Sequence, residues 1–431
     1  MIKGNGYSGW ARLWDDLQDR NAGLLRNQVL RNVAALGSGS GLAQAIMAVN
    51  AIIFARFLSP EGYGLLIGAY AAAGLTSFLF NWGLDTWLLR HAAMAEQPGV
   101  LLGNVLSLKA AFGLIWGAAL LAWLPRLRPD LYLTPLLLVS ILDVWAEGLF
   151  TTQTAVLTTQ KRVPTASALL VVSRGGRLLN TLILILFGLR TPLVFAQGRL
   201  VGTLVALGIA LYLLRPHFSS GELSQAGRLF RLSLPYGLSD LLATLYLQAD
   251  VTLLGLLLGV GRTVGLYAPA SGLVNALFVI PAAAYVVMIP VLTRQLESGS
   301  GQFSRNVRVM YIGFTLLGVA MWWGLVIAGR LLVAWLLGQA YQTSGFLLVV
   351  LSPILFLKAL SFASAAVLVA VGWQSRRLGP QALSAVANIL LNLYAIPRFG
   401  VWGVASVYVA SETILTVGYL LQVVKWFRMR R

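Results

Sequence analysis

The chain of 431 residues contains no cysteine and only two histidines. Without cysteine it has no disulfides, thiolate nucleophiles or cysteine-based metal sites. Two imidazoles, His91 and His217, are too few for a histidine metal cluster. The remaining residues form no nucleophile–base arrangement of the kind that hydrolases and transferases need. We therefore predict that the chain is not an enzyme and that it has no catalytic residue, metal or cofactor.

Charge is also scarce. Charged residues make up 11% of the chain and hydrophobic residues 58%, whereas a soluble globular domain carries about 25% charge. A chain this apolar is solvated by lipid, and its backbone polar groups are satisfied inside its own helices. The net charge of +18 then indicates attraction to anionic membrane lipid rather than to nucleic acid.

Apolar stretches of about 20 residues, the length that crosses a bilayer, recur twelve times. The predicted spans are 33–57, 64–89, 101–124, 133–157, 165–188, 192–214, 234–258, 265–292, 309–331, 344–371, 378–396 and 399–424. The connections between them are short and leave no room for an extramembrane catalytic domain. The sequence predicts an all-α polytopic membrane protein of about 12 transmembrane helices in two six-helix bundles.

The span pattern divides the chain into five parts. They are a cytoplasmic N-terminal amphipathic segment (1–32), an N-terminal six-helix bundle (33–214), a cytoplasmic interfacial linker (215–233), a C-terminal six-helix bundle (234–424) and a basic cytoplasmic tail (425–431). With the N-terminus inside, about 20 Lys and Arg fall on one side of the membrane and about seven on the other. We therefore predict a multi-pass protein of the bacterial inner membrane with both termini in the cytoplasm.

The N-terminal segment has an amphipathic pattern. Trp10, Leu13, Trp14 and Leu17 recur at i, i+3, i+4 and i+7 and share one helical face. This pattern is typical of a helix lying in the membrane interface, with tryptophans at headgroup depth. The alternative is a helix that docks a partner, such as a glycan-assembly enzyme.

The two halves show a short internal similarity. FARFLSPEGYGLL (Phe54 to Leu66) and LGVGRTVGLYAPA (Leu258 to Ala270) both leave a span through a short turn and enter a span that begins with glycine. Gly64 and Gly265 correspond. Two halves of six spans each enter the membrane in the same sense, and their ligand is expected between them.

Four motifs, in order, resemble those of one transporter family. They are FARFLSPEGYGLL, YLQADVTLLG (Tyr246 to Gly255), VGLYAPA with VIPAAAYVVMIPVLTRQ (Val279 to Gln295), and NILLNLYAIPRFGVWGVASV (Asn388 to Val407). The chain resembles the Wzx-like polysaccharide and O-antigen flippases of the multidrug/oligosaccharidyl-lipid/polysaccharide (MOP) exporter superfamily. The resemblance implies a V-shaped, MATE/MurJ-like architecture, alternating access, and a polyprenyl-pyrophosphate-linked oligosaccharide as cargo in polysaccharide biosynthesis.

Charged residues inside the predicted spans are costly and therefore need a cavity or a partner. Arg174 and Arg177 lie three residues apart on the fifth span, Asp143 and Glu147 lie four apart on the fourth, and Arg199 is in the sixth. Such spacings place each pair on one helix face. One interpretation is a cationic cavity in which the three arginines bind pyrophosphate. The other is structural neutralisation of the arginines by the two acids.

The second half contains three further buried charges, Asp250, Lys358 and Glu412. Asp250 is either a coupling carboxylate for H+ or Na+, or one member of a fixed structural pair with Lys358; Glu412 is a further possible partner. We slightly favour the pair.

Two other functions fit an apolar polytopic chain. A drug or cation antiporter of the same superfamily predicts an acidic or mostly apolar cavity, and the arginine excess argues against it. A membrane-embedded polysaccharide polymerase or ligase predicts a long external loop. No predicted outer loop exceeds about ten residues, which lies within the range of ordinary connections.

Overall fold

The computed structural model describes residues 22–91, 98–127, 134–160, 162–215, 226–297 and 302–429. Every regular element in these ranges is a helix, and none is a strand. The predicted amphipathic segment with Trp10 and Trp14 lies outside the described residues, as does the first part of the predicted linker. The second part of that linker is the start of a helix, α10 (Ala226–Leu258).

Seven predicted spans are single helices without a break: α10 and six others. The six others are α2 (Ala22–Phe57), α6 (Pro98–Leu127), α7 (Thr134–Thr159), α8 (Val163–Leu186), α9 (Pro192–Leu214) and α13 (Gln302–Leu336). Proline near the start of α9 costs no hydrogen bond, because the first helical N–H groups have no partner within the helix. Thr191 completes that start by accepting a hydrogen bond from the Val194 N–H (3.3 Å).

Three predicted spans are broken into shorter helices. The second consists of α3 (Pro60–Thr76), α4 (Phe78–Asn81) and α5 (Leu84–His91); the eighth of α11 (Arg262–Leu277) and α12 (Val279–Glu297); and the tenth of α14 (Gln342–Leu351) and α15 (Pro353–Ala370). The break before α5 is sharp because Trp82 and Gly83 both have positive φ, at 41° and 69°. Short 3-10 turns precede α14 and the last helix at Gln339–Tyr341 and Gln374–Arg377.

The last helical stretch, α16 (Leu378–Met429), contains two crossings. Its backbone leaves helical geometry at Gly400, where φ is +56°. Ser384 Oγ donates to the Ser411 carbonyl (2.7 Å), and Asn388 Nδ2 donates to Ser411 Oγ (3.2 Å). Residues so far apart in sequence lie side by side because the chain reverses at Gly400.

The span count agrees with the sequence. Ten helical stretches among the described residues are long and apolar enough to cross a bilayer, with α16 counted once. The second crossing of α16 makes eleven, and α10, whose apolar end is Gln248–Leu258, makes twelve. The predicted all-α fold with about 12 transmembrane helices is therefore confirmed.

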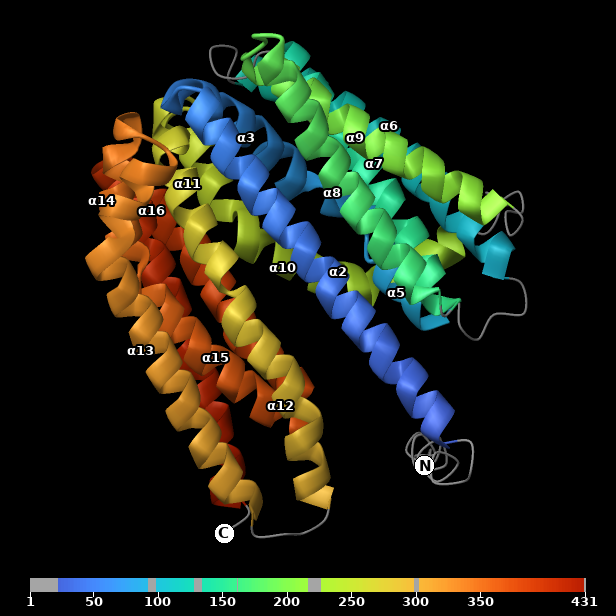
Figure 1. The fold of residues 1–431 in the computed structure, drawn as a ribbon, viewed down its shortest axis with the longest axis vertical. Helices are drawn as coiled ribbons and strands as arrows, with labels where there is room; N and C mark the ends of the chain where they lie inside the picture. Colours follow the sequence, from blue (N-terminus) through green and yellow to red (C-terminus); the bar gives the residue numbers. More distant parts are fainter. Residues whose placement is uncertain are drawn as a thin grey trace.

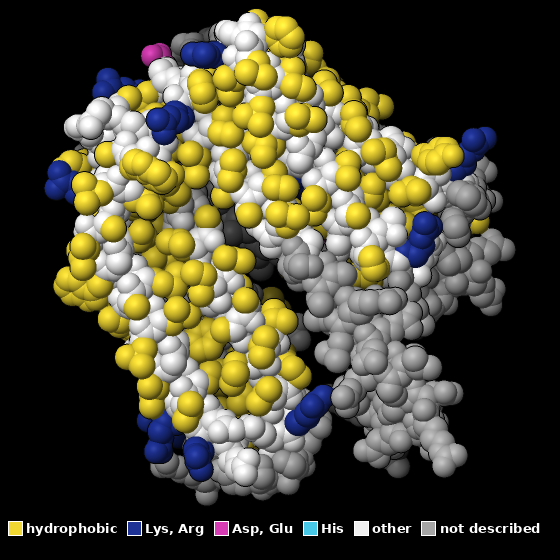
Figure 2. All heavy atoms as spheres, viewed as in Figure 1, with side chains coloured by type: hydrophobic (Ala, Val, Ile, Leu, Met, Phe, Trp, Pro, Cys, Tyr) yellow, Lys and Arg dark blue, Asp and Glu magenta, His cyan; other side chains and the backbone are white. Residues whose placement is uncertain are grey.

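The helices form two lobes arranged as a V (Figure 1). The N-lobe contains α2 to α9 and the C-lobe α11 to α16. The lobes meet where α3 packs on α11, and they diverge toward the end of the molecule at which α2 begins and α16 ends (Figure 1). The visible face is covered by hydrophobic side chains, with Lys and Arg near the helix ends (Figure 2). Lipid is the natural solvent of such a face.

The seventh span connects the lobes. In the first part of α10, Phe230 stacks on Trp82 of the N-lobe with ring centroids 4.8 Å apart. The Tyr236 hydroxyl accepts a hydrogen bond from Arg90 (3.2 Å). Farther along α10, Asp250 accepts a hydrogen bond from Asn392 of the C-lobe (2.9 Å). The two ends of α10 are therefore anchored in different lobes.

The closed end of the V is a contact between the two turns of the internal repeat. A Cβ added to Gly64 would lie 1.8 Å from the Gly261 carbonyl oxygen, and one added to Gly265 would lie 1.6 Å from that of Pro60. Only glycine permits backbones to approach this closely. Nearby, the Tyr341 hydroxyl donates to the Leu58 carbonyl (3.1 Å) across the lobes.

Candidate functional site

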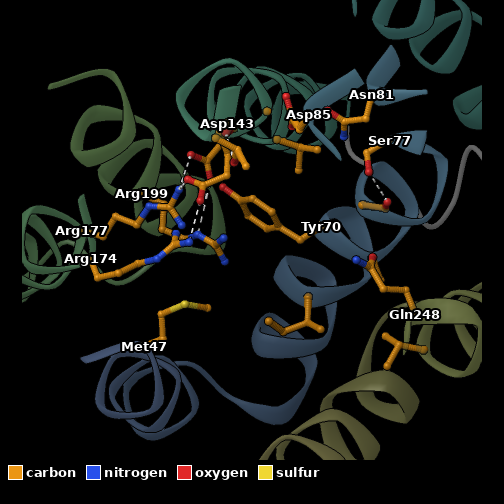
Figure 3. A pocket seen from close by; sticks show the side chains of 18 residues that line it. Met47, Tyr70, Ser77, Asn81, Asp85, Asp143, Arg174, Arg177, Arg199 and Gln248 are labelled. Atoms are coloured by element: carbon orange, nitrogen blue, oxygen red, sulfur yellow. Dashed lines mark hydrogen bonds and ion pairs between the residues drawn. The ribbon is translucent and has the colours of Figure 1, made fainter. Parts of the chain in front are cut away.

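A cavity of about 470 Å³ lies beside the N-lobe and faces α10. Side chains from α2, α3, α4, α5, α7, α8, α9 and α10 line it. Its polar wall carries Asp143 and Glu147 of α7, Arg174 and Arg177 of α8, and Arg199 of α9 (Figure 3). The five charged residues predicted for the first half of the chain thus gather on one wall of the cavity, which we call the arginine wall.

Arg177 is the buried centre of this cluster. Its side chain is 5% exposed, and one terminal nitrogen, Nη2, lies 3.5 Å from Asp143 and at hydrogen-bond distance from Glu147. Arg177 Nε also donates to Thr203 Oγ1 at 3.0 Å. A Cβ on Gly202 would lie 2.6 Å from the Arg177 backbone nitrogen, so the glycine lets α9 approach α8 closely enough for these contacts.

Asp143 is held on its buried side. It is 2% exposed, accepts a hydrogen bond from the Thr203 hydroxyl, and lies 3.4 Å from Arg199 Nε. The Arg199 guanidinium in turn lies 3.8 Å from the ring centroid of Tyr70. Cation–π contact of this kind stabilises a guanidinium that is removed from water. Tyr70 thereby fixes the orientation of Arg199 from α3.

Glu147 and Arg174 are nearer the cavity. Arg174 Nη2 donates to Glu147 Oε1 at 2.6 Å, and their side chains are 15% and 25% exposed. The second oxygen of Glu147 accepts a hydrogen bond from Arg177. The cluster holds three guanidiniums and two carboxylates, so its formal charge is +1. A cationic wall with guanidinium donors is suited to an anion that carries several oxygens.

A second ion pair closes another side of the cavity. Lys109 is fully buried, and its ammonium group donates to both oxygens of Asp85 (3.0 and 2.9 Å), to the Gly148 carbonyl (2.7 Å) and to Thr152 Oγ1 (2.8 Å). Asp85 lines the cavity. Because Lys109 neutralises it, Asp85 leaves the positive balance of the arginine wall unchanged.

The family is decided by comparison with known proteins. The model of a family described as polysaccharide biosynthesis protein matches residues 29–296, more than half of the chain. The chain belongs to this Wzx-like flippase family. No curated protein matches the chain.

Solved structures of MOP superfamily transporters share the fold. The inward closed conformation of the lipid II flippase MurJ aligns with a TM-score of 0.72 at 12% identity, covering 90% of this chain and 87% of MurJ. An inward-facing multidrug resistance transporter of the MATE family aligns at 0.61 and 15% identity, covering 90% and 94%. A MOP superfamily transporter from Pyrococcus furiosus aligns at 0.59 and 14%, covering 94% and 95%. The predicted V-shaped architecture is therefore confirmed.

In this member of the Wzx-like family, the three charged residues predicted for the second half of the chain are not among the residues that line the cavity. Lys358 of α15 pairs with Glu412 of α16, with Nζ 2.8 Å from Oε1. Asp250 instead accepts hydrogen bonds from Asn392 Nδ2 (2.9 Å) and the Tyr267 hydroxyl (3.2 Å). The favoured expectation of an Asp250–Lys358 pair is wrong. Asp250 is satisfied by the Asn392 amide and the Tyr267 hydroxyl instead of by an ammonium group. Lys358 has Glu412 as its ion-pair partner.

Sequence reasoning about this flippase-family chain missed the uncharged members of the site. Tyr70 and Thr203 orient Arg199, Asp143 and Arg177, yet a lone hydroxyl in an apolar helix has no sequence signature. Asp85 and Lys109 were identifiable as intramembrane charges. Their ion pair joins α5 to α6. Spacing along one helix says nothing about contacts between two helices, so the pair could not be predicted from it.

Proposed function

We propose that the protein flips a polyprenyl-pyrophosphate-linked oligosaccharide across the bacterial inner membrane by alternating access, for the biosynthesis of a surface polysaccharide. The arginine wall carries this proposal. Arg174 and Arg199 reach a cavity beside the seam of two lobes, and the wall's net charge is positive. A pyrophosphate between lipid and sugar is the anionic part of such a cargo, and guanidinium forks match its oxygens.

The shape of the molecule supports the direction of the proposed movement. The V is open at the end where α2 begins and α16 ends (Figure 1), and the charge distribution predicts that both termini are cytoplasmic. The cavity would therefore accept cargo from the cytoplasmic side, where lipid-linked sugars are assembled. The sugar would occupy the cavity while the polyprenyl chain remains in lipid.

The positive charge of the arginine wall also favours this proposal over its nearest alternative. A multidrug or cation antiporter must stabilise a cationic ligand, and a wall of formal charge +1 repels it. The fold alone is shared by both kinds of transporter. The chemistry of the wall therefore favours anionic cargo.

We expect Arg199→Gln and Arg174→Gln each to reduce polysaccharide export by about tenfold or more, because a hydrogen bond to a charged group contributes about 1.5–3 kcal/mol. The test is surface polysaccharide in a strain whose own copy of the gene is replaced, together with accumulation of lipid-linked oligosaccharide inside the cell. Arg199→Lys keeps the positive charge and removes the guanidinium fork, so it distinguishes the effect of charge from that of bidentate hydrogen bonding. Arg190→Gln is the control, since Arg190 is exposed in the connection between α8 and α9 and packs on Phe57.

Western blotting of the membrane fraction shows whether each variant is present at the normal level. Undiminished export by both Arg174→Gln and Arg199→Gln would contradict the assignment of cargo to this wall. Arg177→Ala is a poorer test, because the Arg177 side chain is 5% exposed and its loss takes a guanidinium from Asp143 and from Glu147 at once. Removing one partner of a buried pair costs about 3–5 kcal/mol, so the protein level would fall as well.

A further inference from the structure

Glu147 differs from the other acid of the arginine wall in its access to the cavity. Its side chain is 25% exposed, whereas that of Asp143 is 2% exposed. Both of its oxygens are engaged by guanidiniums: one accepts from Arg174 at 2.6 Å, and the other accepts from Arg177. Glu147 therefore presents a two-oxygen anion to two arginines at the surface of the cavity.

Asp143 has the opposite arrangement. Arg177, Arg199 and the Thr203 hydroxyl hold it from the protein side. Arg199 is 20% exposed and lines the cavity, so a ligand can reach it while Asp143, 2% exposed, stays on the buried side of the wall. Asp143 is a permanent member of the wall, and Glu147 is the acid that a ligand meets.

Arg174 depends on Glu147 alone. Among the described residues, Glu147 is its ion-pair and hydrogen-bond partner. Its side chain extends from α8 along the cavity wall, with Met47 of α2 facing it (Figure 3). A group that displaced Glu147 would gain the donors of Arg174 without disturbing the buried contacts of Arg177 with Asp143 and Thr203.

We propose that Glu147 is an internal competitor for the anionic group of the cargo: the phosphate oxygens displace its carboxylate from Arg174 and take the same guanidinium donors. The inference rests on the proposed function and concerns how the same site controls affinity. Two oxygens bridging two guanidiniums is the geometry in which a phosphate binds arginine. With Glu147 withdrawn, the wall presents three guanidiniums to the cargo against one carboxylate, and its formal charge rises from +1 to +2.

The displaced carboxylate has polar neighbours. Thr151 lines the cavity one helical turn farther along α7. Asn81, which also lines it, lies beside the following residue of α7: its Oδ1 is 3.3 Å from the position of a Cβ on Gly148. The Asn81 amide can donate to the withdrawn carboxylate, and the Thr151 hydroxyl, which donates to the Glu147 carbonyl (2.8 Å), can turn to it instead. Glu147 can therefore leave the arginines without becoming an unsatisfied polar group.

An internal competitor suits a transporter because cargo must leave as well as bind. A bare guanidinium cluster would hold a pyrophosphate tightly and release it slowly. When Glu147 returns to Arg174, it replaces the hydrogen bonds that the departing phosphate gives up. Neither direction then leaves a buried arginine without a counterion, which would cost several kcal/mol.

The test is binding of inorganic pyrophosphate, and of farnesyl pyrophosphate as a short lipid probe, to the purified full-length protein by isothermal titration calorimetry. We expect Glu147→Gln to tighten binding of both about tenfold relative to the natural sequence, since the competing charge-assisted hydrogen bonds are lost. In an Arg174→Gln background, Glu147→Gln should tighten binding less than it does in the natural sequence, because only the bond of Glu147 to Arg177 is then left to be released.

Glu61→Gln is the matched control. It removes one negative charge from an exposed residue in the first turn of α3, away from the cavity. Equal tightening by Glu61→Gln and Glu147→Gln would indicate a general effect of net charge and would overturn the proposal. Pyrophosphate binding that is unchanged or weaker in Glu147→Gln overturns it too, while leaving the anionic cargo supported. If neither the natural protein nor Glu147→Gln binds pyrophosphate or farnesyl pyrophosphate, the proposed cargo itself is wrong.

Discussion

Replacing Gly64 by alanine is expected to weaken the closed end of the V. The added Cβ would lie 1.8 Å from the Gly261 carbonyl oxygen and 2.6 Å from the Gly265 nitrogen. Ordinary contact begins at 3.4 Å, so the two turns must separate by 1.6 Å, the difference between 3.4 and 1.8 Å. Both opposing atoms belong to the backbone of the other lobe, and no side-chain rotation relieves the overlap.

The size of the effect follows from the cost of overpacking. An extra carbon forced into a close-packed contact typically costs about 1–3 kcal/mol. A conformation in which α3 and α11 are apart does not pay this cost, so the ratio of open to closed molecules should rise by a factor of about 5 to 150. Alanine is a better helix former than glycine, so the substitution does not weaken α3 itself. Any destabilisation therefore comes from the overlap between the two turns.

The assay uses the absence of cysteine from the chain. Val260 is 1% exposed and packs against Gly68 of the other lobe, where a Cβ would lie 2.6 Å from the valine side chain. In a Val260→Cys protein in nanodiscs, the single thiol should react slowly with a fluorescent maleimide. Adding Gly64→Ala should increase the reaction rate by at least about fivefold.

Gly313→Ala in the same Val260→Cys protein is the control, since no atom lies within 4 Å of a Cβ at that position. An unchanged maleimide rate with Gly64→Ala would show that α3 and α11 tolerate the extra carbon without separating. Faster labelling with Gly313→Ala would show that the rate reports on helix propensity or general loosening. Either result would refute the reasoning from the glycine contact.

Lys358→Met should lower the midpoint of heat unfolding, measured by tryptophan fluorescence, because loss of one partner of a buried pair costs about 3–5 kcal/mol. The double variant Lys358→Met/Glu412→Gln should recover part of that loss. A double variant no more stable than Lys358→Met would count against the pair. If Asp250 couples transport to H+ or Na+, Asp250→Asn should remove the pH or sodium dependence of flux in proteoliposomes, and an unaltered dependence rules the role out. Tags at both termini should resist protease added to intact spheroplasts, and cleavage of either tag would contradict the predicted orientation.

The fold was predictable because two strong physical constraints act on every span. Each crossing needs about 20 apolar residues, and each backbone group must be paired inside the helix. The same constraints allowed the charged residues of the arginine wall to be predicted. Arg174 and Arg177 had to share a face because they are three residues apart, and buried arginines need acids, of which Asp143 and Glu147 were the nearest candidates.

Contacts between helices were predicted less well, because helical spacing says nothing about how two spans are rotated against each other. The Asp250–Lys358 pair was the clearest error, since α10 turns Asp250 toward Asn392 and Tyr267. Broken spans escaped prediction for a related reason. The left-handed conformation of Trp82 depends on tertiary packing, in which its ring stacks on Phe230.

The distribution of charge between the lobes bears on how easily they can move. Every ion pair of the arginine wall lies within the N-lobe, on α7, α8 and α9, and the Lys358–Glu412 pair lies within the C-lobe. At the closed end, the lobes meet through glycine backbone and hydrogen bonds to carbonyl groups, such as Tyr341 to Leu58. A hydrogen bond of this kind contributes about 0.5–1.5 kcal/mol, whereas separating a buried ion pair costs about 3–5 kcal/mol. Rocking of one lobe against the other would therefore leave these ion pairs intact, and the arginine wall would move as a unit. The contacts that change are those of the closed end, including the apolar side chains, such as Leu66 and Tyr267, that share one core cluster across the lobes.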